Sequence, residues 1–180
     1  MNLNELFEKA IVHREQHQCS AYPYESYDRL FEIVTVENPD RILEIGSGCG
    51  FSACVMMLAS PRLQLDSIEK DPEHVKAARQ FLQENLTPQA AGRVRIIEGI
   101  AEEVLERLTE GYDLIFFDGY QIHYEFLPHY KRLLKAGGLL VLGNTHLSSK
   151  TSDNFFAELS NGKDGKIMDR FAETILARRI

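Results

Sequence analysis

Three glycines at alternate positions, Gly46, Gly48 and Gly50, separate a short aliphatic run from a stretch that is typical of a helix. We interpret residues 41–45 as a buried strand and residues 52–59 as the helix. Glycines at such a turn let the backbone bend and let a ligand approach closely, and a helix N-terminus offers unpaired N–H groups that favour negative charge. The pattern therefore predicts an anion- and nucleotide-binding turn.

An acidic side chain follows at the distance that nucleotide sites use. Glu69 lies nineteen residues after Gly50 and ends the next predicted strand, residues 64–68. A carboxylate there accepts hydrogen bonds from both hydroxyls of a ribose, which argues against a turn that binds nothing. Phe51 stands where the dinucleotide fingerprint G-x-G-x-x-G has its third glycine. This departure, together with the lack of a substrate domain, argues against a nicotinamide-binding domain.

The segment Glu-Ile-Gly-Ser-Gly-Cys-Gly-Phe-Ser-Ala, residues 44–53, resembles motif I of class I S-adenosylmethionine-dependent methyltransferases. Within that class it is similar to the catechol and caffeoyl-CoA type O-methyltransferases and their small bacterial relatives. The resemblance implies that S-adenosylmethionine is the cofactor. It further implies that Ser52 donates to the methionine carboxylate and that Glu69, beside Lys70, holds the ribose. The residues expected around the methionine part are Glu44, Gly46, Ser47, Gly48 and Gly50.

Two later strand ends carry residues that the same resemblance assigns to the site. Gly99-Ile100-Ala101 is similar to the family's segment beside the adenine, where backbone N–H groups make the contacts. Ile100 cannot supply a carboxylate to the adenine amine. Residues 116–124, Phe-Phe-Asp-Gly-Tyr-Gln-Ile-His-Tyr, resemble the family's Asp-Ala-Asp-Lys-x-x-Tyr motif. That likeness places Asp118 near the methionine ammonium and Tyr120 against the adenine.

The same motif bears on catalysis. The resembled enzymes form an acceptor oxyanion with a divalent cation and a lysine, and Asp118 and Asn144 keep two of the metal ligands. The third ligand, an aspartate, is replaced by Gly143, and the lysine is replaced by Gln121. One carboxylate and one amide make a weak magnesium site, and Gln121 can orient an acceptor but cannot take its proton. We therefore expect no magnesium requirement. The candidates for a replacement base are His123, His129 and His146, of which His146 is best placed beside Asn144.

The elements that must position these residues alternate regularly. We expect helices at 4–16 and around Tyr27–Val34, then strands at 41–45, 64–68, 93–98, 112–117 and 139–142. The intervening helices are predicted at 52–59, from Asp71-Pro72, at 101–109, at 127–135 closed by Gly137-Gly138, and at 153–159, before a hairpin of 166–170 and 174–179. This is an α/β fold with a Rossmann-like doubly wound seven-stranded sheet, mostly parallel, helices on both faces and an antiparallel C-terminal hairpin.

We expect one domain, residues 1–180. In the resembled family, N-terminal segments such as residues 1–38 cover the cofactor and acceptor site or form a homodimer contact; plain packing helices are the alternative. The net charge of −7 argues against nucleic-acid and membrane-surface binding. Three cysteines without a C-x-x-C, and no signal peptide or spanning segment, indicate a reduced, cytoplasmic setting. We interpret the chain as an O-methyltransferase for a small-molecule acceptor. A methyltransferase for a hydroxylated tRNA base and a catalytically silent S-adenosylmethionine-binding protein remain alternatives.

Overall fold

The computed structural model describes residues 2–147 and 150–180. Its helices are α1 (Leu3–Gln16), α2 (Tyr27–Glu37), α3 (Phe51–Ala59), α4 (Pro72–Asn85), α5 (Pro88–Ala91), α6 (Ala101–Arg107), α7 (Leu127–Leu133) and α8 (Lys150–Ser160), with a 3₁₀ turn η1 (Tyr124–Phe126). Its strands are β1 (Arg41–Ile45), β2 (Gln64–Glu69), β3 (Val94–Glu98), β4 (Tyr112–Phe117), β5 (Leu134–Leu142), β6 (Gly165–Phe171) and β7 (Thr174–Arg179).

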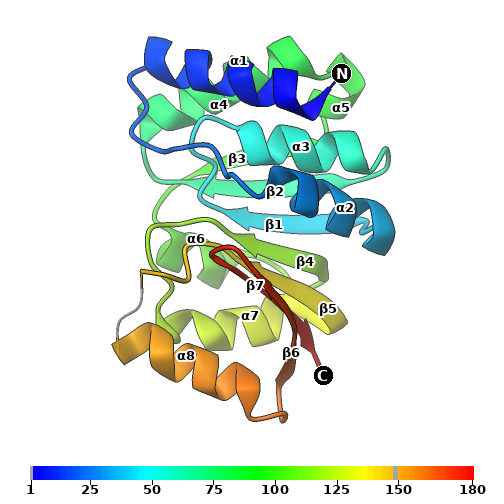
Figure 1. The fold of residues 1–180 in the computed structure, drawn as a ribbon, viewed down its shortest axis with the longest axis vertical. Helices are drawn as coiled ribbons and strands as arrows, with labels where there is room; N and C mark the ends of the chain where they lie inside the picture. Colours follow the sequence, from blue (N-terminus) through cyan, green and yellow to red (C-terminus); the bar gives the residue numbers. More distant parts are fainter. Residues whose placement is uncertain (1, 148–149) are drawn as a thin grey trace.

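The strands form one sheet in the order β3-β2-β1-β4-β5-β7-β6. The first five are parallel, whereas β7 pairs antiparallel with β5 and with β6 (Figure 1). This confirms the predicted mostly parallel seven-stranded sheet with a terminal hairpin. The strand order reverses between β1 and β4, and open α/β sheets bind ligands at the carboxyl ends of the strands at such a point.

Two hydrophobic cores cover the two faces of the sheet. Because alternate residues of a strand point to opposite faces, Ile42 packs with α1–α4 while Leu43 packs with α6–α8. Figure 1 accordingly shows α1–α4 together in the upper half and α6–α8 in the lower half. α1 is anchored on α4 by the His13 side chain, whose Nε2 lies 2.9 Å from the Ala77 carbonyl. The predicted helices on both faces are confirmed, and the N-terminal pair packs on the α3 and α4 side.

Most predicted boundaries agree to within two residues, but one prediction was wrong. Gly137 and Gly138 do not close a helix, because α7 ends at Leu133 and β5 begins at Leu134. The glycines lie in an irregularity of β5, where the pairing with β4 shifts register. A Cβ on Gly138 would lie 2.7 Å from Leu134 Cδ1 and 2.9 Å from the Asp113 carbonyl oxygen, so only glycine fits there. The predicted strand 139–142 is thus the second half of a longer one.

Two short elements, α5 and η1, are not among the predicted ones. α5 has its own start signal, because Thr87 caps it and Pro88 occupies its first turn. Among the described residues, none of the helices has the length and apolar character needed to cross a membrane.

Candidate functional site

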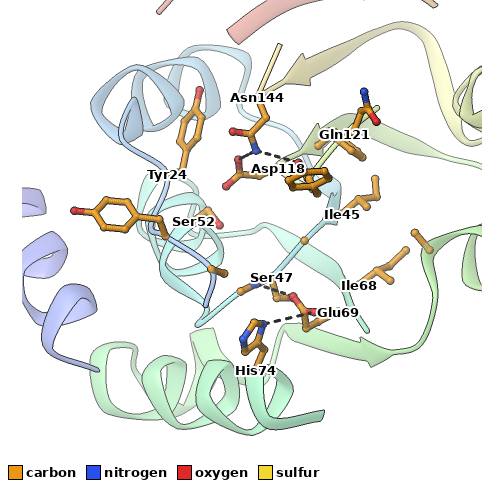
Figure 2. A pocket seen from close by; sticks show the side chains of 18 of the residues that line it. Tyr24, Ile45, Ser47, Ser52, Ile68, Glu69, His74, Asp118, Gln121 and Asn144 are labelled. Atoms are coloured by element: carbon orange, nitrogen blue, oxygen red, sulfur yellow. Dashed lines mark hydrogen bonds and ion pairs between the residues drawn. The ribbon is translucent and has the colours of Figure 1, made fainter. Parts of the chain in front are cut away.

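A cavity of about 1170 Å³ opens at the carboxyl ends of β1, β2 and β4. Residues 20–26, which link α1 to α2, form part of its wall, as does the turn between β6 and β7. Figure 2 shows Glu69 and His74 at one end of the view and Asp118 and Asn144 at the other. The predicted site residues that line the cavity are Gly46, Ser47, Gly48, Ser52, Glu69, Lys70, Gly99, Ile100, Ala101, Asp118, Tyr120, Gln121 and Asn144. Glu44, Gly50 and His146 do not line it.

The turn after β1 requires glycine for reasons of shape. Gly46 and Gly50 have φ values of +96° and +87°, which L side chains rarely adopt. A Cβ on Gly46 would lie 2.9 Å from the Asp118 carbonyl oxygen, and one on Gly50 would lie 3.0 Å from the Ala78 backbone. The turn is therefore wedged between the end of β4 and α4, and Gly50 has a packing role.

The Glu69 carboxylate binds the glycine turn from the side. Its Oε2 accepts a hydrogen bond from the Gly48 N–H at 2.9 Å, and its Oε1 accepts from the N–H groups of Lys70 and Asp71 at 2.9 and 3.0 Å. The turn therefore presents its Gly48 N–H to a carboxylate of its own chain. That N–H is therefore engaged within the chain, and the anion-binding role of the turn stays a prediction.

Glu44 is fully buried beneath the turn. Its carboxylate accepts a 2.5 Å hydrogen bond from the Ser52 hydroxyl and another from the Ser67 hydroxyl, which also shares a hydrogen bond with Ser47. Burial raises the pKa of Glu44 to about 7, although the two serine hydrogen bonds act in the opposite direction. In this arrangement the Ser52 hydroxyl donates to Glu44, and its donation to a ligand carboxylate stays a prediction. Glu44 supports the turn from below.

We predict that Glu44 makes the stability of the fold decrease as the pH rises. Between the ordinary pKa near 4.5 and about 7, the folded chain keeps a proton on Glu44 that the unfolded chain releases. Relative to Glu44→Gln, the wild type should then lose up to about 1.4 kcal/mol of unfolding free energy per pH unit in this window. Urea denaturation of both proteins between pH 4.5 and 8 measures the difference.

The matched control is Glu106→Gln, which removes an exposed carboxylate from α6. Its free-energy difference from the wild type should stay nearly constant over the same pH range. A Glu44→Gln difference as flat as that of the control would show that Glu44 is ionised in the folded chain throughout.

Asp118 and Asn144 lie together at the end of the cavity next to β5. The Asn144 Nδ2 donates to the Asp118 Oδ1 at 3.2 Å and to the Gly119 carbonyl at 2.9 Å (Figure 2). Burial, and secondly the nearby Glu44, raise the pKa of Asp118 well above its usual range. A cation in the cavity would stabilise its charged form.

This donor set does not fit a hard divalent cation. The Asn144 amide turns its N–H groups toward the carboxylate, and Gly143 contributes no oxygen from its side chain. A Cβ on Gly143 would lie 3.0 Å from the Asp118 Oδ1 and 3.5 Å from the Tyr24 ring, so an aspartate there would be crowded. Within residues 2–147 and 150–180, histidine, cysteine and carboxylate side chains form no group of three that could hold a metal ion.

The predicted acid–base residues are not all at the cavity. Gln121 lines it, but its Nε2 donates to the Leu147 carbonyl at 3.0 Å. His146 is nearly half exposed and pairs with Glu173, with 2.6 Å between Nδ1 and Oε2. Of the three candidate histidines, His123 lines the cavity, whereas His129 and His146 do not. The catalytic roles of Gln121 and His146 stay predictions. Because it lines the cavity, His123 is a better placed candidate base than His146.

Sequence reasoning missed two cavity residues, Tyr24 and His74. The Tyr24 hydroxyl shares a 2.6 Å hydrogen bond with Thr174, which ties the α1–α2 linker to the C-terminal hairpin. His74 Nδ1 lies 3.9 Å from the Glu69 carboxylate. The signal for His74 was its place in the first turn of α4, the helix that follows the short Lys70-Asp71 connection after Glu69. Nothing near Tyr24 in the sequence indicates a partner 150 residues away.

Residues 43–145 match the family model described as a methyltransferase domain. The chain belongs to the methyltransferase domain family. This confirms the resemblance drawn from residues 44–53, and the matched span contains the glycine turn, Glu69 and Asp118.

Two mycobacterial relatives of this methyltransferase domain carry names that provisionally assign them to the O-methyltransferases. The protein of Mycobacterium sp. strain JLS is 36% identical over 129 residues, which is 69% of this chain and 57% of that protein. The protein of Mycolicibacterium smegmatis is 36% identical over 117 residues, or 62% of this chain and 54% of that protein. The chain thus spans only a little more than half the length of these relatives.

Solved structures of O-methyltransferases share the fold of this methyltransferase domain. One from Bacillus cereus, in complex with SAH, has a TM-score of 0.83 at 17% identity and covers 98% of this chain and 91% of that one. One from Streptomyces achromogenes, in complex with SAM, has a TM-score of 0.81 at 19% identity, covering 98% and 89%. At these identities the likeness shows the fold alone.

Proposed function

We propose that this methyltransferase domain binds S-adenosylmethionine in the cavity and transfers its methyl group to the hydroxyl of a small acceptor. The observation that carries the proposal is the meeting of three neighbouring strand ends in one cavity. The glycine turn follows the central strand β1, Glu69 ends β2 on one side, and Asp118 follows β4 on the other. The named activity of the relatives supports the same function.

The residues of this chain suit a cofactor that carries positive charge. Glu69 stays within reach of ribose hydroxyls while its backbone hydrogen bonds fix its position. Asp118, whose carboxylate accepts from the Asn144 amide among the described residues, would gain an ammonium partner. Ile100 and Tyr120, which are 51% and 83% exposed, offer apolar surface to an adenine. When bound, the cofactor supplies a methyl group on a sulfonium.

The chain's own candidate for removing the acceptor proton is His123. It lines the cavity beside Phe126, with 5.9 Å between the ring centroids. Gln121 cannot accept a proton at its amide, and His146 is engaged with Glu173. A neutral imidazole at His123 would take the proton as the acceptor oxygen attacks.

The charge of the cavity wall restricts the acceptor. Of the residues that the structure describes, one lysine, Lys70, lines the cavity together with several carboxylates, namely Glu25, Glu69, Asp71, Glu102, Asp118 and Glu173. A polyanion such as RNA or a coenzyme A thioester would be repelled there. We therefore infer a neutral or amine-bearing acceptor, and the tRNA alternative becomes the weaker one.

We expect S-adenosylmethionine to bind in calorimetry, and a panel of catechol-type and amine-bearing phenols to yield a methylated product by mass spectrometry. Product formation should continue in excess chelator, because Asp118 and Asn144 do not form a site for a hard cation. His123→Gln should reduce turnover by at least roughly a hundredfold, which is the lower end of the usual contribution of a positioned base.

His146→Gln is the matched control, since that histidine lies outside the cavity lining, and its turnover should stay near that of the wild type. Turnover that chelator abolishes and magnesium restores would contradict the metal-free route. Tight cofactor binding without product from any acceptor would favour the second candidate, a silent binding protein, which the Gln121–Leu147 hydrogen bond also favours. Failure of the cofactor to bind would overturn the proposal.

A further inference from the structure

Two of the three cysteines meet at the cavity although they come from separate segments. Cys19 lies in the linker between α1 and α2, and Cys49 lies in the glycine turn. Both are buried, and they pack together in one cluster with Ala77 of α4. Cys49 lines the cavity, so small solutes reach the pair from there. Cys54, by contrast, is fully buried in α3 among aliphatic side chains.

The linker is held directly against the glycine turn. The Arg14 Nε donates to the Ala21 carbonyl at 2.9 Å, and the Ser20 N–H donates to the His74 Nε2 at 3.3 Å. A Cβ on Gly48 would lie only 3.0 Å from the Ala21 Cβ. The two segments are therefore packed against each other, which keeps Cys19 and Cys49 in one cluster.

The surroundings of the thiols favour reaction at Cys19. The neighbouring Cys49 thiol lowers the pKa of Cys19 to about 7 against the opposing effect of burial, and the nearby His74 acts in the same direction as Cys49. The same contact raises the pKa of Cys49. Cys19 is thus the thiol that ionises near neutral pH, and a thiolate is the reactive form of cysteine.

We propose that Cys19 and Cys49 form a redox-active dithiol whose oxidation to a disulfide reshapes the glycine turn and weakens cofactor binding. The oxidant is a peroxide. The Cys19 thiolate attacks one peroxide oxygen, the O–O bond breaks, and hydroxide leaves, so that Cys19 becomes a sulfenic acid. The Cys49 sulfur then attacks the Cys19 sulfur, the S–O bond breaks, and the hydroxide takes up the Cys49 proton as water. Two thiols are oxidised, and one peroxide is reduced.

The effect on the cofactor follows from the geometry of the turn. A disulfide requires the two sulfur atoms to approach to about 2.05 Å. Because Gly48 and Ala21 already touch, the turn must rotate to allow this approach, and Gly48 N–H is the group that Glu69 holds. The expected loss of cofactor affinity rests on the proposed function, whereas formation of the Cys19–Cys49 disulfide does not.

The test uses the full chain, reduced or treated with hydrogen peroxide. Intact mass should fall by two hydrogen atoms, peptide mapping should link Cys19 to Cys49, and the three free thiols should decrease to one. The Kd for S-adenosylmethionine should rise at least tenfold and return to its starting value with dithiothreitol. Because ligand and redox equilibria are coupled, a tenfold change means that bound cofactor raises the reduction potential of the pair by about 30 mV.

Cys19→Ala and Cys49→Ala should each abolish the linked peptide and the peroxide effect on Kd, whereas Cys54→Ala should retain both. An oxidised protein without the Cys19–Cys49 link, or one that carries the link with unchanged Kd, would overturn the inference. Absence of cofactor binding in the reduced protein, with the link still forming, would instead count against the proposed function alone.

Discussion

Gly46→Ala will destabilise the fold by about 3 kcal/mol or more and abolish measurable cofactor binding. Two costs add at this position. The backbone has a φ of +96°, and the new methyl group would lie 2.9 Å from the Asp118 carbonyl oxygen and 3.0 Å from its carbon. The clash is with backbone at the end of β4, so relief requires the cavity wall to move. Chemical denaturation and calorimetry measure the two effects.

Gly162→Ala separates the two costs. Gly162 has a comparable φ of +75°, in the segment between α8 and β6, but a Cβ there would have no neighbour within 4 Å. This variant should lose only the cost of backbone strain, about 1–2 kcal/mol, and bind cofactor normally. Equal destabilisation of both variants would show that the close approach of Gly46 to β4 adds nothing to the loss of unfolding free energy.

Asp118→Asn is expected to weaken cofactor binding tenfold to a hundredfold while making the empty protein more stable at pH 8. The binding loss follows because a charge-assisted contact to the ammonium contributes about 1.5–3 kcal/mol. The stability gain follows because burial raises the pKa of Asp118, so ionisation above that pKa costs the folded state free energy. An asparagine can still accept the hydrogen bond from Asn144.

The sign of the stability effect depends on pH. Below the ordinary carboxyl pKa, both states of the wild type are protonated at Asp118 and the variant has no advantage, whereas its advantage should grow as pH rises. Asp40→Asn, at an exposed position before β1, is the control and should change neither cofactor affinity nor this pH dependence. A variant that binds cofactor as tightly as the wild type would remove Asp118 from the proposed site.

The sheet and most of the cavity floor could be predicted because their signals are local. The glycine turn, Glu69 and Asp118 each follow a strand that its own aliphatic residues reveal, and parallel topology then brings the strand ends together. Gly137-Gly138 misled the prediction because the same pair that ends a helix also fits an irregular strand. Only the pairing of β5 with β4 shows that the glycine pair lies in a strand and does not end a helix.

The cavity wall could not be predicted because it depends on contacts between distant segments. Tyr24 is placed by Thr174, and the Cys19–Cys49 pair exists only because the linker crosses the glycine turn. The Glu69 hydrogen bond to Gly48 is a further case, since it engages an N–H of the turn within the chain. The spacing of residues in the sequence does not predict these contacts.

The hydrogen bond between Tyr24 and Thr174 also bears on the order in which the chain folds. Contacts between residues far apart in sequence close large loops and form slowly, whereas a hairpin forms locally. Because β7 lies between β5 and β6, the hairpin must dock before Thr174 can reach Tyr24. The glycine turn and Glu69 pack on β1, β2, α4 and the end of β4 and do not need the hairpin, so they should gain protection before residues 20–26 in pulse-labelled hydrogen exchange. The part of the cavity formed by the glycine turn and Glu69 would then fold before the part formed by residues 20–26 and the β6–β7 turn.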